Sequence, residues 1–394
     1  MNITFEQLEE KAKEFFLMAD EGVIRLLCAT VIANKLSGDP VWLLIVAPPS
    51  GLKTELINAL DDVSDIYHLS SLTPQTLISG QKRAGQETSL LMKLTGKILT
   101  FKDFTTILEL NHNARDEILS QLREVYDGKY SKSFGTGDEI KWEGKIGFIA
   151  GVTDAIELHQ GRISVLGERF IQYRMKQPDR EDATEKGIEN AGQIVAIRKE
   201  MREMFLDLIK SINVDDNMPD IPPELKQEII KLSSFGTLAR TGIVRDSKDR
   251  EISYTFPAEM PVRFAKQLIQ ICKAFLIMGG LGEKEYEIVK RIAISSVPRN
   301  RRNTLLILLK KRQDVDLKDR EAVTTEREDE ETDLFEESSE EIEWTTRSIA
   351  MMLDLPTTTT RRILEELNAL GLVQRQGKGQ GNQMTWTLKP KYRD

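Results

Sequence analysis

A lysine–threonine pair behind a loop of proline and glycine is the part of this sequence best suited to chemistry. The apolar run 43–46 stops at the loop, and Lys53-Thr54 opens the helical pattern 55–60. This strand–loop–helix order is typical of a phosphate-binding P-loop, whose backbone N–H groups face an anion. Lys53 would reach the β- and γ-phosphates of ATP, and the Thr54 hydroxyl would ligate Mg²⁺. The residues predicted to surround the phosphates are Ala47, Pro48, Pro49, Ser50, Gly51, Leu52, Lys53 and Thr54.

This loop departs from the usual G-x-x-x-x-G-K-[ST] pattern at both glycine positions. Ala47 stands at the first, and Leu52 precedes the lysine at the second, with Gly51 displaced by one place. An ordinary strand–turn–helix with an incidental Lys-Thr pair is therefore the alternative interpretation.

Two other expected strands end in polar residues that could complete such a site. Asp103 follows the apolar run 98–101 and could hold Mg²⁺ through water or act as the base that activates water, or it could simply cap a turn. Thr153 ends the apolar stretch 145–153 and Asp154 follows it, and either residue could orient the attacking water or the γ-phosphate. Asp154 could equally cap a helix that begins near residue 155.

Three arginines could supply positive charge as the γ-phosphate leaves. Arg169, in Gly167-Glu168-Arg169-Phe170, is favoured for completing a neighbouring subunit's site, with Arg174 as the nearby competitor and a surface salt bridge as the plain alternative. Arg263 lies in the first turn of a helix restarted by Pro261, where it could reach a nucleotide or simply be exposed.

The elements expected around these residues alternate between strand and helix. Alternation of this kind predicts an α/β fold, a parallel sheet covered by helices on both faces. The expected helices cover 4–36, 86–91 and 115–127; the expected strands cover 42–46, 65–69, 97–101 and 145–153; a hairpin is expected over 130–142.

Five ranges describe the expected organisation. They are an N-terminal helical segment (1–40), an α/β ATPase core (41–178), a helical lid (179–319), a flexible acidic linker (320–343) and a C-terminal winged-helix domain (344–394). The last range follows the order helix, turn, helix and hairpin. Its basic residues Arg361, Arg362, Arg375 and Lys378 suit contact with a DNA backbone, although winged helices also bind proteins.

Composition excludes several classes of protein. No apolar run approaches the roughly 20 residues of a membrane span. The N-terminus has no signal pattern, and two cysteines and three histidines have no metal-site spacing, so a cytoplasmic protein is expected. The range 326–343 holds eleven acidic residues and one arginine, whereas the range 344–394 holds eight basic and four acidic residues.

Taken in order, these motifs resemble an AAA+ ATPase, and most of all the minichromosome maintenance (MCM)-like helicases of bacterial phages and mobile elements. The resemblance covers roughly 40–394 and rests on APPSGLKTEL, ILTFKDFTTIL, the hairpin before GFIAGVTD, LGERFIQYRM and EMPVRFAKQL. These segments are similar to the family's P-loop, Walker B strand, pre-sensor-1 hairpin, arginine finger and sensor-2 helix. Two features depart from the family: Lys102-Asp103-Phe104 replaces the acidic pair of Walker B, and no large β-rich domain precedes the core.

The resemblance implies a homo-oligomer, a hexameric ring, that hydrolyses ATP with Mg²⁺ and translocates or unwinds DNA during replication. ATP would lie between subunits, with Lys53, Thr54 and Asp103 from one and Arg169 and Arg263 from the next. Lys129 and Lys132 would contact single-stranded or forked DNA in the channel, independently of sequence. A helicase loader or replication initiator, and an ATP-responsive winged-helix transcriptional regulator, are the alternatives.

Overall fold

The computed structural model describes residues 3–20, 22–78, 89–133, 139–159, 169–214, 219–309, 344–377 and 385–392, and the backbone of short strands at 82–83 and 86–87. The predicted acidic linker, the hairpin tip 134–138 and Lys378 lie outside the described residues. The chain forms two compact units, one of residues 1–230 and 262–296 and one of residues 231–261 and 297–394. The boundaries of these two units differ from the boundaries of the five predicted ranges. The five-range organisation therefore stays a prediction.

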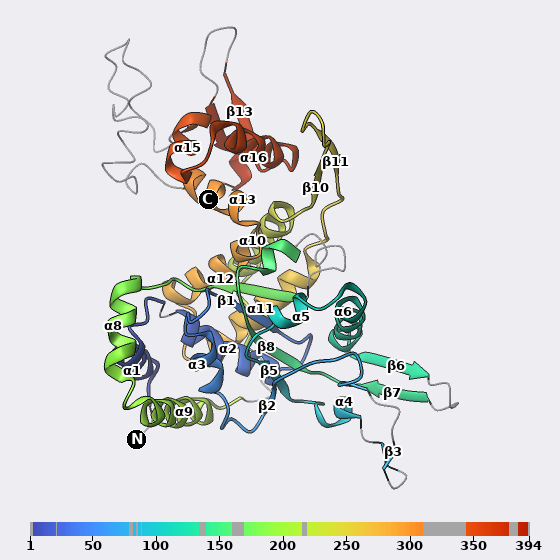
Figure 1. The fold of residues 1–394 in the computed structure, drawn as a ribbon, viewed down its shortest axis with the longest axis vertical. Coiled ribbons are helices and arrows are strands. Elements are labelled where there is room, and N and C mark those ends of the chain that lie inside the picture. Colours follow the sequence, from blue (N-terminus) through green and yellow to red (C-terminus); the bar gives the residue numbers. More distant parts are fainter. Residues whose placement is uncertain are drawn as a thin grey trace. The chain divides into compact units, whose positions relative to one another are not determined.

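A five-stranded parallel sheet forms the centre of the first unit (Figure 1). Its order is β2-β5-β8-β1-β9, and every neighbouring pair runs parallel. The strands are β1 (Trp42–Val46), β2 (Ile66–Leu69), β5 (Ile98–Phe101), β8 (Gly147–Val152) and β9 (Phe170–Arg174). All residues of β1, β5 and β8 are buried, which explains why these strands are continuous apolar runs rather than alternating ones. The predicted α/β sheet is therefore confirmed.

Helices cover both faces of this sheet. Successive side chains on a strand point to opposite faces of the sheet, so alternate residues of β1 share one face. On that face, Trp42, Leu44 and Val46 belong to one buried cluster with Ile118 and Leu122 of α6. On the other side, α2 and α3 contact β8 and α12 contacts β9. The helices of this unit include α1 (Phe5–Phe16), α2 (Gly22–Lys35), α3 (Lys53–Asn58), α4 (Leu90–Lys93), α5 (Thr105–Leu108), α6 (His112–Tyr126), α8 (Arg180–Asn190), α9 (Ile194–Ser211), α11 (Val262–Ile277) and α12 (Glu283–Ser295), and α10 (Pro223–Ala239) continues into the second unit.

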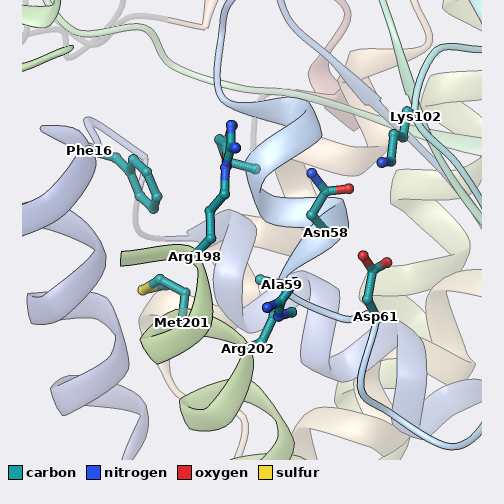
Figure 2. Close-up of a pocket in the computed structure, with 9 residues that line it drawn as sticks. Phe16, Asn58, Ala59, Asp61, Lys102, Arg198, Met201 and Arg202 are labelled. Carbon is teal, nitrogen blue, oxygen red and sulfur yellow. The ribbon is translucent and has the colours of Figure 1, made fainter. Parts of the chain in front are cut away.

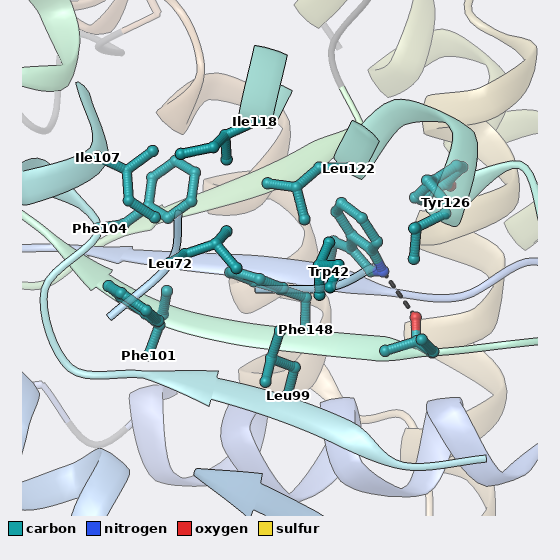
Figure 3. Packing of buried hydrophobic residues seen from close by; sticks show 14 of the residues in the cluster. Trp42, Leu72, Leu99, Phe101, Phe104, Ile107, Ile118, Leu122, Tyr126 and Phe148 are labelled. Atoms are coloured by element: carbon teal, nitrogen blue, oxygen red, sulfur yellow. Dashed lines mark hydrogen bonds between the residues drawn. The ribbon is translucent and has the colours of Figure 1, made fainter. Parts of the chain in front are cut away.

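Trp42 anchors the core at the amino-terminal end of β1 (Figure 3). Its indole N–H donates to the carbonyl oxygen of Ile146 at 2.8 Å, and its ring meets that of Tyr126 edge to face with 5.2 Å between centroids. A buried indole that keeps a hydrogen bond combines a large apolar area with a satisfied polar atom. The contact ties β1 to the start of β8 and to the end of α6.

The second unit contains the C-terminal helices and a small antiparallel sheet of order β12-β14-β13. Helix α15 ends at Leu353 with Asp354 as its C-cap, and α16 follows after a short turn, before the hairpin of β13 and β14. The elements are α13 (Arg299–Leu308), β12 (Trp344–Thr345), α15 (Thr346–Leu353), α16 (Thr357–Ala369), β13 (Val373–Gln376), β14 (Thr385–Leu388) and a 3-10 turn at Pro390–Tyr392. The predicted order helix, turn, helix and hairpin is present in this range.

Two local predictions were wrong. Instead of a helix over 86–91, β3 (Lys82–Arg83) pairs with β4 (Gln86–Glu87), and α4 follows. The range 179–319, which was predicted to be a mostly helical lid, also contains a hairpin of β10 (Ile243–Arg245) and β11 (Ile252–Thr255) that was not predicted. Its β-branched residues around a turn rich in aspartate were the available signal.

Among the helices of the described residues, none combines the length and the apolar character needed to cross a lipid bilayer.

Candidate functional site

The polar strand ends come together at the carboxyl edge of the sheet because all five strands run parallel. Strand β1 lies between β8 and β9, with Val46 opposite Val152 on one side and Arg174 on the other. The strand order therefore reverses at β1, with its neighbours β8 and β9 on opposite sides. In open α/β sheets, ligands bind outside the carboxyl ends of the strands where the strand order reverses. The Lys53 loop, Thr153 and Arg174 therefore share one edge.

The loop after β1 has a left-handed backbone at two residues that are not glycine. Ser50 has φ 61° and Leu52 has φ 63°. Gly51 between them has no room for a side chain, because a Cβ would lie 2.9 Å from the Pro48 carbonyl oxygen and 3.1 Å from the Ala47 Cβ. Leu52 thus adopts, at the second glycine position of the P-loop pattern, the conformation that glycine ordinarily supplies.

The left-handed conformation at Leu52 leads to a stability prediction. It costs an ordinary L-residue about 1–2 kcal/mol, and a β-branched side chain tolerates it least. We expect Leu52→Gly to leave the free energy of unfolding within about 1 kcal/mol of the wild type, because relief of strain offsets the greater flexibility of the unfolded chain. Leu52→Val should be less stable than Leu52→Gly by about 2 kcal/mol. Guanidinium titration measures both, and equal stabilities would contradict an imposed left-handed loop.

Lys53 lies inside this loop, with 6% of its surface exposed. Its ammonium group donates to the carbonyl oxygens of Ala47 and Pro48, each at 2.6 Å. Burial lowers the pKa of Lys53, while the charges of Asp103 and Asp154 act in the opposite direction. A desolvated cation whose hydrogen bonds go to neutral carbonyls is an electrostatically suitable site for an anion.

Asp103 and Thr153 are joined through Thr105, which the sequence interpretation missed. The backbone N–H of Phe104 donates to Gly151 at 2.7 Å and brings the end of β5 against β8. The Thr105 hydroxyl lies 3.2 Å from that of Thr153 and accepts the Thr153 N–H at 3.0 Å. Asp103 is exposed, and one of its carboxylate oxygens accepts the Thr105 N–H at 3.0 Å. Asp103 thus caps a turn, which was the alternative to its predicted role as a metal ligand or base. No spacing rule in the sequence pointed to Thr105.

The predicted cap at Asp154 is not the one in the structure. The Ala155 N–H donates to the Thr153 hydroxyl at 3.3 Å, and Asp154 instead forms an ion pair with Arg174 at 2.6 Å. Local sequence favours the nearest carboxylate as a cap. The tertiary structure brings an arginine from the far side of β1 and changes the partner.

These residues fit a nucleotide and Mg²⁺. The N-cap residue of α3, Leu52, makes no side-chain hydrogen bond to the first turn, whose N–H groups have no intrahelical acceptor and can face a phosphate. Gly151 lets β8 pack closely against Lys53, because a Cβ there would lie 2.6 Å from the Lys102 carbonyl oxygen and 3.2 Å from the Lys53 Cβ. No group of three or more His, Cys, Asp or Glu side chains among the described residues could hold a metal alone. Thr54 and Asp103 would offer two oxygen ligands, which suits Mg²⁺ because it usually takes its other ligands from phosphates and water.

Arg169 and Arg263 do not join this edge. Arg169 immediately precedes β9, so it lies at the amino-terminal edge of the sheet, opposite Lys53. It is 7% exposed, and its guanidinium lies 2.8 Å from an Asp127 carboxylate oxygen and 5.8 Å from the Tyr126 ring centroid. Burial lowers the pKa of Arg169, and the positive charge of the half-buried Arg263 lowers it further.

The lysines of the predicted channel hairpin are paired with acidic side chains. The hairpin consists of β6 (Lys129–Ser133) and β7 (Glu139–Glu143). Lys129 lies 3.6 Å from Glu143, and Lys132 lies 3.8 Å from Glu117 of α6. Such solvent-accessible pairs are weak and leave the lysines able to change partner.

In the second unit, the predicted DNA-binding arginines lie on the surface. Arg361 pairs with Glu365 at 2.9 Å, Arg362 is exposed, and Arg375 lies 6.0 Å from the Trp386 ring centroid. The neighbouring carboxylate Glu366 is held by Arg245 at 2.9 Å and by Arg301 at 2.8 Å. These two ion pairs neutralise one acidic residue of α16, while Arg361 and Arg362 of the same helix stay exposed.

A separate pocket of about 220 Å³ lies beside α3 (Figure 2). The lining residues are Phe16, Glu55, Asn58, Ala59, Asp61, Lys102, Arg198, Met201 and Arg202. Arg198 of α9 binds both carboxylate oxygens of Glu55, at 2.6 and 2.8 Å. The pocket contains none of Lys53, Asp103 and Thr153, so it is distinct from the candidate phosphate site.

Neither a protein-family profile nor a curated protein sequence matches this chain. A solved structure from Cytophaga hutchinsonii ATCC 33406, named a "putative ATPase", aligns with 73% of this chain and 84% of its own length, at 15% identity and a TM-score of 0.44. A likeness this distant carries no argument about activity.

Proposed function

We propose that this protein binds and hydrolyses ATP at the loop 47–54, as an AAA+ ATPase of the MCM-like type. The observation that carries the proposal is the buried ammonium group of Lys53, held by two loop carbonyls at 2.6 Å beside a left-handed backbone at Leu52. A strand–turn–helix without a ligand would not be expected to bury a cation that forms no ion pair among the described residues, or to hold the preceding residue in a left-handed conformation. A phosphate group would give that cation an ionic partner.

Each residue at the carboxyl edge of the sheet would have a separate role in ATP hydrolysis. Lys53 would exchange its carbonyl partners for the β- and γ-phosphates, with the first-turn N–H groups of α3 beside it. Thr54 and Asp103 would hold Mg²⁺, which neutralises charge that develops on the phosphates. Thr153, whose hydroxyl is oriented by Thr105 and Ala155, would position the attacking water.

Arg169 and Arg263 support an oligomer. Because both lie away from the Lys53 edge of their own sheet, they can stabilise a leaving phosphate only in a neighbouring subunit. We therefore propose a homo-oligomer, hexameric as in the family that the sequence resembles, with one ATP site at each subunit contact. Arg169 would leave Asp127 when it contacts that site.

DNA is the proposed partner of the assembled protein. Lys129 and Lys132 on the hairpin would exchange their carboxylate partners for DNA phosphates, and Arg361, Arg362 and Arg375 would contact the backbone from the winged-helix domain. The resulting activity is DNA translocation or unwinding in the replication of a phage or mobile element. A loader or initiator is the second candidate, because Asp103 has no adjacent acidic residue and hydrolysis could be slow.

ATP turnover measured with and without single-stranded and forked DNA tests this proposal. We expect a rate that rises several-fold with DNA and a stimulation that weakens as salt increases, because phosphate contacts release counterions. Turnover indifferent to DNA would favour a loader or regulator. The absence of both nucleotide binding and turnover would contradict the ATPase itself.

A further inference from the structure

An ion pair crosses the carboxyl end of β1 at the point where the Lys53 loop begins. Strands β8 and β9 flank β1, and Val152 and Arg174 are both in register with Val46. Asp154 follows Val152 by two residues, and its carboxylate lies 2.6 Å from the Arg174 guanidinium. The pair therefore connects the two strands on either side of the loop.

Arg174 also connects this edge to the last residue of α12. Its Nε donates to the Ser295 carbonyl oxygen at 2.8 Å, and its backbone N–H donates to the Ser295 hydroxyl at 3.3 Å. The second terminal nitrogen, Nη2, lies 2.7 Å from a Glu157 carboxylate oxygen. The side chain is 12% exposed, so the guanidinium is held between two carboxylates in a largely buried place.

Asp154 links the ion pair to the phosphate site. Its charge is one of two carboxylate charges that act on the Lys53 ammonium group, the other being that of Asp103. Lys53, Asp154 and Arg174 thus all follow or end strands at the same carboxyl edge of the sheet, with Asp154 carrying the opposite charge to the other two. A phosphate beside Lys53 would repel Asp154 and would attract the guanidinium, which binds phosphate with two parallel hydrogen bonds. Asp154 is 56% exposed, so its carboxylate can turn into water at little cost.

We propose that Arg174 binds the terminal phosphate of ATP within its own chain, and that its exchange of Asp154 for that phosphate reports the nucleotide state to α12 through Ser295. This inference rests on the proposed ATP site and adds a regulatory contact to it. In the structure, Asp154 and Glu157 hold the guanidinium. ATP competes with them, whereas ADP lacks the phosphate that would do so.

Binding of fluorescent ADP and of a non-hydrolysable ATP analogue tests the exchange in wild type, Arg174→Lys and Asp154→Asn. Arg174→Lys keeps the charge but loses the planar fork, so we expect affinity for the ATP analogue to fall about tenfold while ADP affinity stays unchanged. Asp154→Asn removes the competing charge and should raise affinity for the ATP analogue several-fold. Hydrogen exchange over 283–296 should differ between the ATP analogue and ADP in wild type, and this difference should disappear in Arg174→Lys.

Arg198→Lys is the matched control, because Arg198 also binds a carboxylate, that of Glu55 in α3, but lines the separate pocket. It should bind both nucleotides as the wild type does. Equal effects of Arg174→Lys on the ATP analogue and ADP, or none on either, would overturn the exchange while wild-type binding upheld the ATP site. Failure of wild type and Arg198→Lys alike to bind nucleotide would overturn the proposed function and the exchange together.

Discussion

Replacing Lys53 with alanine should reduce ATP turnover to background and weaken nucleotide binding by about 100-fold or more. A charge-assisted hydrogen bond to phosphate is worth about 1.5–3 kcal/mol, and the lysine would contact two phosphates. The variant also loses the two 2.6 Å bonds that hold Ala47 and Pro48 in place, so the loop itself loses its shape. Calorimetric titration with ATP and a phosphate-release assay measure the two effects.

Lys97→Ala provides the matched control for this experiment. Lys97 also donates to a backbone carbonyl, that of Ser64 at 3.0 Å, but it precedes β5 and lies at the opposite edge of the sheet. Its removal should leave turnover unchanged. Since alanine at 53 removes a buried charge, the free energy of unfolding should not fall substantially. Binding by a folded Lys53→Ala protein within threefold of wild type would contradict a phosphate site in this loop.

Arg169→Ala should reduce turnover by about 10³-fold while nucleotide binding is retained, because an arginine supplied to a neighbouring site acts mainly on the transition state. The loss should be reversible by mixing. Subunits carrying Arg169→Ala and subunits carrying Lys53→Ala are each inactive alone, but some contacts in a mixed oligomer join an intact Lys53 to an intact Arg169. Turnover in a titration of one variant into the other should therefore rise to a maximum between the two pure proteins.

The ion pair between Arg169 and Asp127 calls for a control in the same assay. Alanine at 169 leaves the Asp127 carboxylate without its 2.8 Å partner, which could disturb the end of α6 for structural reasons alone. Asp127→Asn breaks the same pair but keeps the arginine. If Asp127→Asn lost as much turnover as Arg169→Ala, and mixing restored nothing, the interpretation of Arg169 as a residue that acts on a neighbour would be wrong.

The sheet and the loop were largely predictable because their signals are local. Continuous apolar runs predicted β1, β5 and β8, which the structure buries on both faces. A strand followed by a tight turn and Lys53-Thr54 predicted where the loop lies, although Ala47 and Leu52 replace the two glycines of the usual pattern. The hairpin of β10 and β11 was missed because its short strands sit between long helical patterns, and short apolar runs do not separate strand from helix.

Spacing along the chain determined which residues could do chemistry, but only the tertiary structure decided where each could act. Arg169 and Arg174 are five residues apart and were competitors for one role, yet they stand at opposite ends of β9 and therefore at opposite edges of the sheet. The sequence left Asp154 either a role at the phosphate site or a helix cap, but the structure pairs it with Arg174 because β8 and β9 lie on either side of β1. Strand order is set by packing between segments far apart in sequence, so the partners of these charged residues cannot be found from local pattern alone.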